Sequence, residues 1–167
     1  MTTVDVNSFI GATHQEQVGT KRIPVPVGDY VGQVGLGDND IALEAGVSGP
    51  NSKNPGTPWK RLDVNITIPD PSGSIKSTTG RDPVVVRMGI MLDLAADGGL
   101  DLSTGKNQRL ARLVAAAGWP VDGKGNLTPG WSIGSVKGKQ IKLSITHRPN
   151  PNDSSEVYEE VSKVTTP

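Results

Sequence analysis

The residue types that carry nucleophilic or phosphate chemistry are sparse in this chain. It has no cysteine and no Gly-x-Ser-x-Gly motif, and its two histidines, His14 and His147, lie far apart in the sequence. Nucleophilic catalysis needs a nucleophile with an activating base beside it. Residues 32–37 (GQVGLG) match neither nucleotide-binding fingerprint, and no Gly-Lys-Ser/Thr follows them. We therefore expect a protein that is not an enzyme and that needs no cofactor.

Acidic residues do not form a convincing metal site either. Asp38 and Asp40, with Glu44, resemble part of a hard-cation loop, but a third ligand and the loop glycine are absent. A solvated turn is the better interpretation, and we expect no bound metal. The glutamates within residues 156–160 would alternate between the two faces of a strand. That arrangement favours a solvated strand edge over an acidic cluster.

Basic and aromatic residues are the remaining candidates for function. Seventeen Lys and Arg balance seventeen Asp and Glu, which argues against binding nucleic acid by bulk charge. The basic excess is confined to residues 101–150. Proteins that bind single strands combine cations along the backbone with stacking platforms for bases. The candidates for such a surface are Trp59, Arg61, Arg87, Lys139, Lys142, Arg148 and Lys53. The alternative is a core or rim position for Trp59 and a solvated surface for the cations.

The elements that must position these residues are mostly strands. Alternating apolar residues predict strands over residues 29–35, 59–68, 84–92, 139–147 and 156–164. Between them lie long polar segments rich in Gly and Pro, which predict loops over residues 36–58, 69–83 and 148–155. Residues 1–22 are polar and read as an N-terminal arm, followed by a single domain over residues 23–167.

One helix is predicted, over residues 106–117. Leu110, Leu113, Val114 and Ala117 share one face at helical spacing. Gly118 fits the position that ends a helix in the left-handed conformation. Ser103, Thr104 or Asn107 could cap the first turn. Arg109 and Arg112 fall on the other face and are expected to be solvated.

The order of these elements predicts the fold class. Three strands, a helix and two strands form the arrangement of a mainly β, five-stranded OB-like Greek-key barrel, with the helix between strands 3 and 4. A β-sandwich and a lone sheet with one helix are the alternatives. OB-folds bind oligonucleotides on the face of strands 2 and 3, between the loops that join strands 1–2 and 4–5. Here those loops are residues 36–58 and 148–155, beside the candidate residues.

Four short segments resemble a family of bacteriophage proteins with single-stranded-DNA-binding members. They are residues 24–30 (PVPVGDY), 104–110 (TGKNQRL) ahead of Ala-Gly-Trp at 117–119, 136–143 (VKGKQIKL) and 158–161 (YEEV). The resemblance spans most of the chain. It implies an OB-like fold and a role in phage DNA replication or recombination. It does not extend to the acidic tail with which many single-strand binders recruit partners, since the chain ends SKVTTP.

Taken together, the sequence predicts a non-enzymatic, phage-type protein whose partner is single-stranded DNA. The runner-up is a virion structural protein or a capsid or tail decoration protein, which the polar arm and the neutral charge would also suit. There is no apolar run long enough to cross a membrane, and the N-terminus lacks the pattern of a signal peptide. With no cysteine, a reducing cytoplasm is the expected location. A homo-oligomer is compatible with the sequence.

Overall fold

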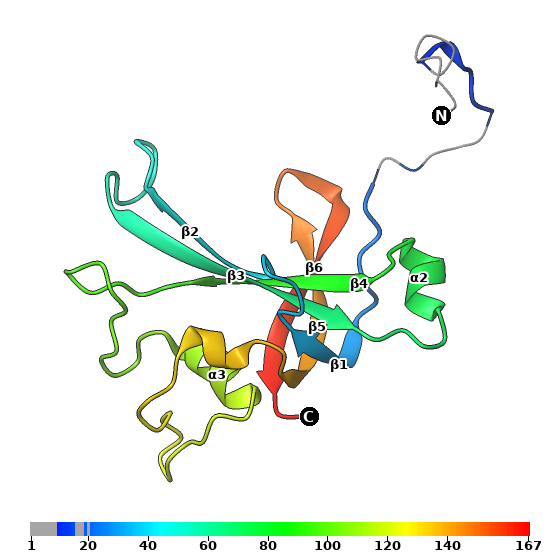
Figure 1. Cartoon of the computed structure of the whole chain (residues 1–167). Helices are drawn as coiled ribbons and strands as arrows, with labels where there is room; N and C mark the ends of the chain where they lie inside the picture. The colour runs from blue at the N-terminus through cyan, green and yellow to red at the C-terminus, as the bar shows by residue number, and fades with distance from the viewer. Residues whose placement is uncertain (1–9, 16–18, 20) are drawn as a thin grey trace, which may run out of the picture.

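The computed structural model describes residues 10–15, 19 and 21–167, and its architecture is mainly β. In these residues, six antiparallel strands form one open sheet, and the helices α2 and α3 accompany it (Figure 1). The strands are β1 (Gly28–Val34), β2 (Ile41–Val47), β3 (Pro58–Ile68), β4 (Val84–Met91), β5 (Gln140–Asn150) and β6 (Asp153–Thr165). The helices are α2 (Ser74–Thr79) and α3 (Gln108–Ala116), with a short 3-10 helix, η1 (Ile133–Val136).

The five predicted strands are present, but the predicted strand count is wrong. Residues 36–58, expected to be a loop, contain β2, which pairs with β3 along its whole length. Ile41, Leu43, Ala45 and Val47 alternate with smaller or polar residues, a pattern that the flanking glycines obscured. The predicted loop over residues 148–155 is instead a tight turn, because β5 continues to Asn150 and β6 starts at Asp153. The predicted loop over 69–83 contains α2.

The sheet order explains the extra strand. The main path is β2-β3-β1-β5-β6, and β4 pairs with β3 on its other edge. Val34 of β1 pairs with Ile66, and Ile41 of β2 pairs with Val64, so β1 and β2 follow each other along one edge of β3. They are two parts of one interrupted strand, with residues 35–40 looped out. The sheet is not closed, since no hydrogen-bonded ladder joins β4 to β6 within the described residues.

The core lies between the inner face of this sheet and α3. Alternate residues of β3, β4 and β5 are buried, and α3 packs against β6 and η1. The predicted apolar face of the helix is confirmed at Leu110, Leu113 and Val114, which are fully buried. Ala116 is also buried, whereas Ala117 is only half-buried. Gly118 has a φ of 99°, the left-handed conformation expected after the helix end.

The start of α3 differs from the prediction. Asn107 precedes the helix with a φ of 51° and makes no side-chain cap. Its side chain instead accepts a hydrogen bond from the Asp93 amide (2.9 Å) and donates to the carbonyls of Asp93 and Asp101 (both 2.9 Å). Arg109, expected to be solvated, donates to the Val161 carbonyl at 2.8 Å. These contacts attach the helix to the end of β4 and to β6.

The last two residues of the predicted N-terminal arm, Lys21 and Arg22, contact β6 through their side chains. Of the predicted arm, residues 1–9, 16–18 and 20 lie outside the described residues. Lys21 pairs with Asp153 (3.6 Å), and Arg22 pairs with Glu159 (3.3 Å), both on β6. No helix in the described part of the chain has the length and apolar character needed to span a bilayer.

Candidate nucleic-acid interface

The outer face of β3 and β4 carries a row of charged side chains. Since Leu62, Val64 and Ile66 point into the core, the odd-numbered residues of β3 point outward. The ladder places Arg61 opposite Met91, Asp63 opposite Gly89, and Asn65 opposite Arg87. Two guanidinium groups therefore flank one carboxylate on this face.

A pocket of about 540 Å³ opens over this face. We call it the arginine pocket. Its walls come from the N-terminal segment, β3, the segment before β4, β4 itself, and the hairpin formed by β5 and β6. The lining residues are Arg22, Pro24, Arg61, Asp63, Arg81, Arg87, Gly89, Arg148, Glu156, Val157, Tyr158 and Glu159. Five arginines thus face three carboxylates within one hollow.

Asp63 holds two of these arginines in place. Its carboxylate accepts hydrogen bonds from Arg87 and from Arg61, the latter at 3.1 Å. Arg61 Nε also forms an ion pair with Asp63 Oδ1 at 3.1 Å, but the geometry of this contact is not that of a hydrogen bond. Arg61 Nη2 extends to Glu44 Oε2 at 2.7 Å. Burial raises the pKa of Asp63, but the two arginines outweigh burial and hold the pKa below its usual value.

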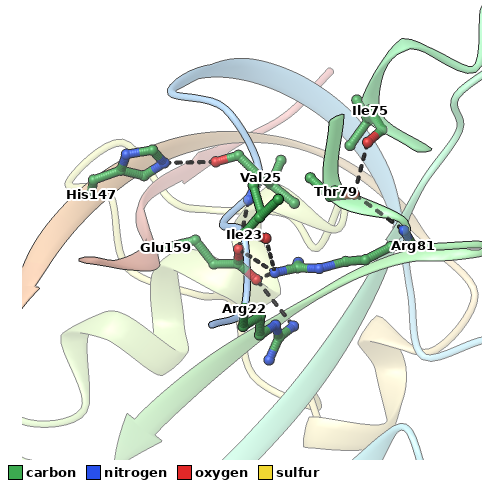
Figure 2. Close-up of polar contacts among 8 residues, drawn as sticks. All are labelled: Arg22, Ile23, Val25, Ile75, Thr79, Arg81, His147 and Glu159. Carbon is green, nitrogen blue, oxygen red and sulfur yellow. Dashed lines mark hydrogen bonds and ion pairs between the residues drawn. The ribbon is translucent and has the colours of Figure 1, made fainter. Parts of the chain in front are cut away.

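Glu159 forms the second ion-pair group of the arginine pocket, shown in Figure 2. Its two carboxylate oxygens accept hydrogen bonds from Arg81 Nη1 (2.6 Å) and Nη2 (2.8 Å). Glu159 also accepts from the Val25 amide at 2.7 Å and pairs with Arg22. Arg81 Nη2 continues to the Ile23 carbonyl, and His147 Nε2 lies 2.8 Å from the Val25 carbonyl. These bonds fasten residues 22–25 to β6 and β5.

The environment of Glu159 keeps it ionised. Burial raises the pKa of this carboxyl group, but hydrogen bonds from Arg81 and Val25 and the nearby positive charges lower it by more. The pKa therefore lies below its usual value. The expectation of a solvated acidic edge over residues 156–160 is wrong for Glu159, whose side chain is mostly buried. Its partners are distant in sequence, so strand alternation could not reveal them.

The side of the pocket formed by the hairpin is more open. Arg148 of β5 lies opposite Tyr158 of β6 in the ladder, and both side chains are exposed. Arg148 makes no ion pair with any residue that the structure describes. Met91, which lies opposite Arg61 in the β3–β4 ladder but does not line the pocket, is 61% exposed. An accessible cation and an exposed aromatic ring therefore line the same pocket as the two arginines held by Asp63.

Trp59 adds an indole ring to the same outer face. It lies two residues before Arg61 on β3 and is half-buried. Its ladder partner is Gly46, where a Cβ atom would come within 2.6 Å of Trp59 Cζ2. The missing side chain lets the ring lie across β2. The ring therefore packs on the backbone of β2, on the outer face of the sheet.

No protein-family model matches the chain, and no curated protein matches its sequence. The function of the chain must therefore be inferred from its residue chemistry and geometry. Within the described residues, no group of three or more His, Asp or Glu is placed to hold a metal ion.

The structure brings together some of the predicted site residues and separates others. Arg61, Arg87 and Arg148 line the arginine pocket, and Trp59 shares their sheet face. Lys53 lies in the β2–β3 loop, Lys139 precedes β5, and Lys142 pairs with Asp29 at 3.6 Å on the outer side of β1 and β5. None of these three lysines lines the pocket. Sequence reasoning missed Arg22, Arg81 and Tyr158, which distant parts of the chain bring to the site.

Proposed function

We propose that this chain is a non-enzymatic, phage-type protein that binds single-stranded DNA in the arginine pocket, in DNA replication or recombination. The observation that carries the proposal is the grouping of Arg61, Arg87 and Arg148 beside exposed Tyr158. Guanidinium groups recognise phosphate oxygens through paired hydrogen bonds, and aromatic rings stack on bases. The pocket offers both kinds of contact within one hollow.

We also propose that the open sheet is an OB-like barrel. β1 and β2 can be counted together as the first of five strands. This first strand pairs with β3, the second, and with β5, the fourth. The second strand pairs with β4, the third, and the fourth pairs with β6, the fifth. α3 lies between the third and fourth strands. β4 and β6, whose pairing would close a barrel, lie close together. In such a fold the arginine pocket occupies the face that binds oligonucleotides.

Electrostatics favours moderate rather than tight binding. Asp63 and Glu44 neutralise much of the charge on Arg61 and Arg87, and Glu159 does the same for Arg81. Arg148 and the 72%-exposed side chain of Arg22 keep their charge directed to solvent. A phosphate group can share Arg61 with Glu44, because that carboxylate is itself half-exposed. We therefore expect stacking to supply a large part of the affinity.

The test compares two variants that each remove one exposed cation. Arg148→Ala removes a pocket residue without leaving a buried partner, so it should weaken binding of a fluorescent oligo-dT strand by about tenfold at low salt, the effect of one charged hydrogen bond. Lys142→Ala is the matched control outside the pocket and should bind normally. Fluorescence anisotropy measures both affinities.

Two outcomes would contradict the proposal. If the wild-type protein fails to bind the oligonucleotide at low salt, the DNA-binding assignment is wrong, and the virion structural alternative becomes the better one. If Lys142→Ala loses as much affinity as Arg148→Ala, the binding face is not the arginine pocket.

A further inference from the structure

One long edge of the sheet has no partner. β2 pairs with β3 on one side, and no described strand pairs with its other side. The Asp40 carbonyl accepts from the Asn65 amide of β3, and the Ser48 amide donates to the Thr57 carbonyl just before β3, so the even-numbered residues of β2 direct their backbone groups toward β3. The amides and carbonyls of Ile41, Leu43, Ala45 and Val47 must therefore point to the free edge.

Apart from the charge of Glu44, this edge lacks the features that usually prevent strand pairing. Natural edge strands are protected by lysine, proline, bulges or short length. β2 has seven residues (IALEAGV), contains neither lysine nor proline, and pairs with β3 in an unbroken register. Leu43 is 56% exposed and Val47 is 63% exposed. With no bulge and with exposed apolar side chains, the strand can accept another strand.

We propose that β2 pairs antiparallel with β2 of a second copy of this chain, joining two sheets into one. The two-fold axis passes beside Glu44, the middle residue of the strand. Leu43 then lies opposite Ala45 of the second copy, and Ile41 lies opposite Val47. In this register all seven residues pair, and the inner face of the junction contains only apolar side chains.

A second copy suits this edge because, in this register, the apolar residues Leu43 and Val47 are covered by apolar residues of the same strand in the other copy. The only charged residue of β2, Glu44, meets its own counterpart at the axis, where two carboxylates would normally repel. Each Glu44 is already bound by Arg61 of its own chain at 2.7 Å, which offsets that repulsion. Figure 1 shows that the β2–β3 hairpin projects from the rest of the sheet, so a second hairpin can approach its edge.

The pairing has a consequence for the arginine pocket, which rests on the proposed function. A two-fold axis perpendicular to a sheet keeps the outer faces of both copies on the same side. Both arginine pockets would then open on one surface, with both Trp59 rings near the junction. One DNA strand could contact the two copies in succession.

The oligomeric state of the full chain tests the pairing without any DNA. Light scattering after size exclusion should give twice the mass of one chain for the wild-type protein. Leu43→Lys places a charge at the junction and should halve that mass. Leu102→Lys, at an exposed leucine (67%) outside β2, should leave the dimer intact. A wild-type monomer, or a dimer that Leu43→Lys does not disturb, would overturn the proposal.

Disulfide trapping tests the register, since the chain has no cysteine of its own. Glu44→Cys should form a covalent dimer on mild oxidation, because residues opposite each other in a non-hydrogen-bonded pair lie within disulfide distance. Ala42→Cys should not, because its counterpart would lie about 13 Å away along the strands. Equal trapping of both variants would mean random collision and would overturn the register. If the Leu43→Lys variant is monomeric and still binds DNA, the proposed function does not depend on the pairing of two copies.

Discussion

Glu159 illustrates how one carboxylate can organise a surface site. It receives both arms of the Arg81 guanidinium and the Val25 amide, and it lies beside Arg22. A partly buried carboxylate with these donors is strongly favoured in its charged form. The same contacts hold the N-terminal segment against β6, so the position of two pocket arginines depends on one residue.

Removing this carboxylate should destabilise the fold in a way that depends on pH. Glu159→Ala should lower the free energy of unfolding by about 3 kcal/mol at pH 7, because Arg81 would be left without its partner. The folded-state pKa of Glu159 lies below the ordinary value of 4.5. Its contribution is therefore complete above that value and disappears as the pH falls through the folded-state pKa. Urea unfolding at pH 7 and at pH 3 measures the change.

Asp38→Ala provides the control for that experiment. The Asp38 side chain is fully exposed, and its one ion pair among the described residues is with Lys137, at 3.8 Å. The variant should unfold like the wild-type protein at both pH values. A Glu159→Ala variant with a stability loss that persists undiminished at pH 3 would contradict the assigned role of the charge.

At the scale of elements, the β2–β3 hairpin depends on a large and a minimal residue placed opposite each other. Trp59 covers Gly46, and any side chain at that glycine would collide with the indole ring. The neighbouring Ala45 points to the other face of the sheet and is exposed. The two positions therefore differ in packing, although they are adjacent in one strand.

Valine substitutions at these two positions should behave oppositely. Gly46→Val should lower the free energy of unfolding by about 1–3 kcal/mol, because the ring must move to accommodate the new side chain. Ala45→Val should be neutral or slightly stabilising, since valine favours strands and has room there. Urea unfolding followed by tryptophan fluorescence compares them. Equal stability of the two variants would mean that Trp59 does not rest on Gly46.

At the scale of the whole molecule, the balance of charge limits how DNA could be bound. Seventeen basic residues offset seventeen acidic ones, so no general attraction to phosphate is available. Binding must come from a local surface. In the arginine pocket that surface has three outward guanidinium groups on the sheet and the hairpin, Arg61, Arg87 and Arg148.

The salt dependence of binding should reflect this small number of contacts. For single strands, the logarithm of the affinity falls with the logarithm of salt concentration with a slope of about −0.7 per phosphate contact. Three contacts predict a slope of about −2. Anisotropy titrations of oligo-dT over a range of sodium chloride concentrations measure it. A slope steeper than about −4 would require further cations such as Lys53, Lys139 and Lys142, and would contradict a site confined to the pocket.

Local pattern in the sequence was sufficient for five of the six described strands and for α3, but not for β2 or α2. Every second residue from Leu62 to Ile68 and from Val84 to Leu92 is apolar, and this period of two located β3 and β4 and directed Arg61 and Arg87 outward. The spacing of Leu110, Leu113 and Val114 located α3 in the same way. These inferences succeed because the side-chain period of a strand or a helix is a property of neighbouring residues.

The tertiary structure alone decided which charges meet. Glu159 binds Arg81 and Val25, which lie far from it in sequence, and Arg148 meets Tyr158 only because β5 and β6 form a long hairpin. The open sheet and the free edge of β2 likewise depend on which strands pair, not on the strands themselves. Ion pairs and strand partners are set by distances between remote residues, and no local period of the sequence encodes those distances.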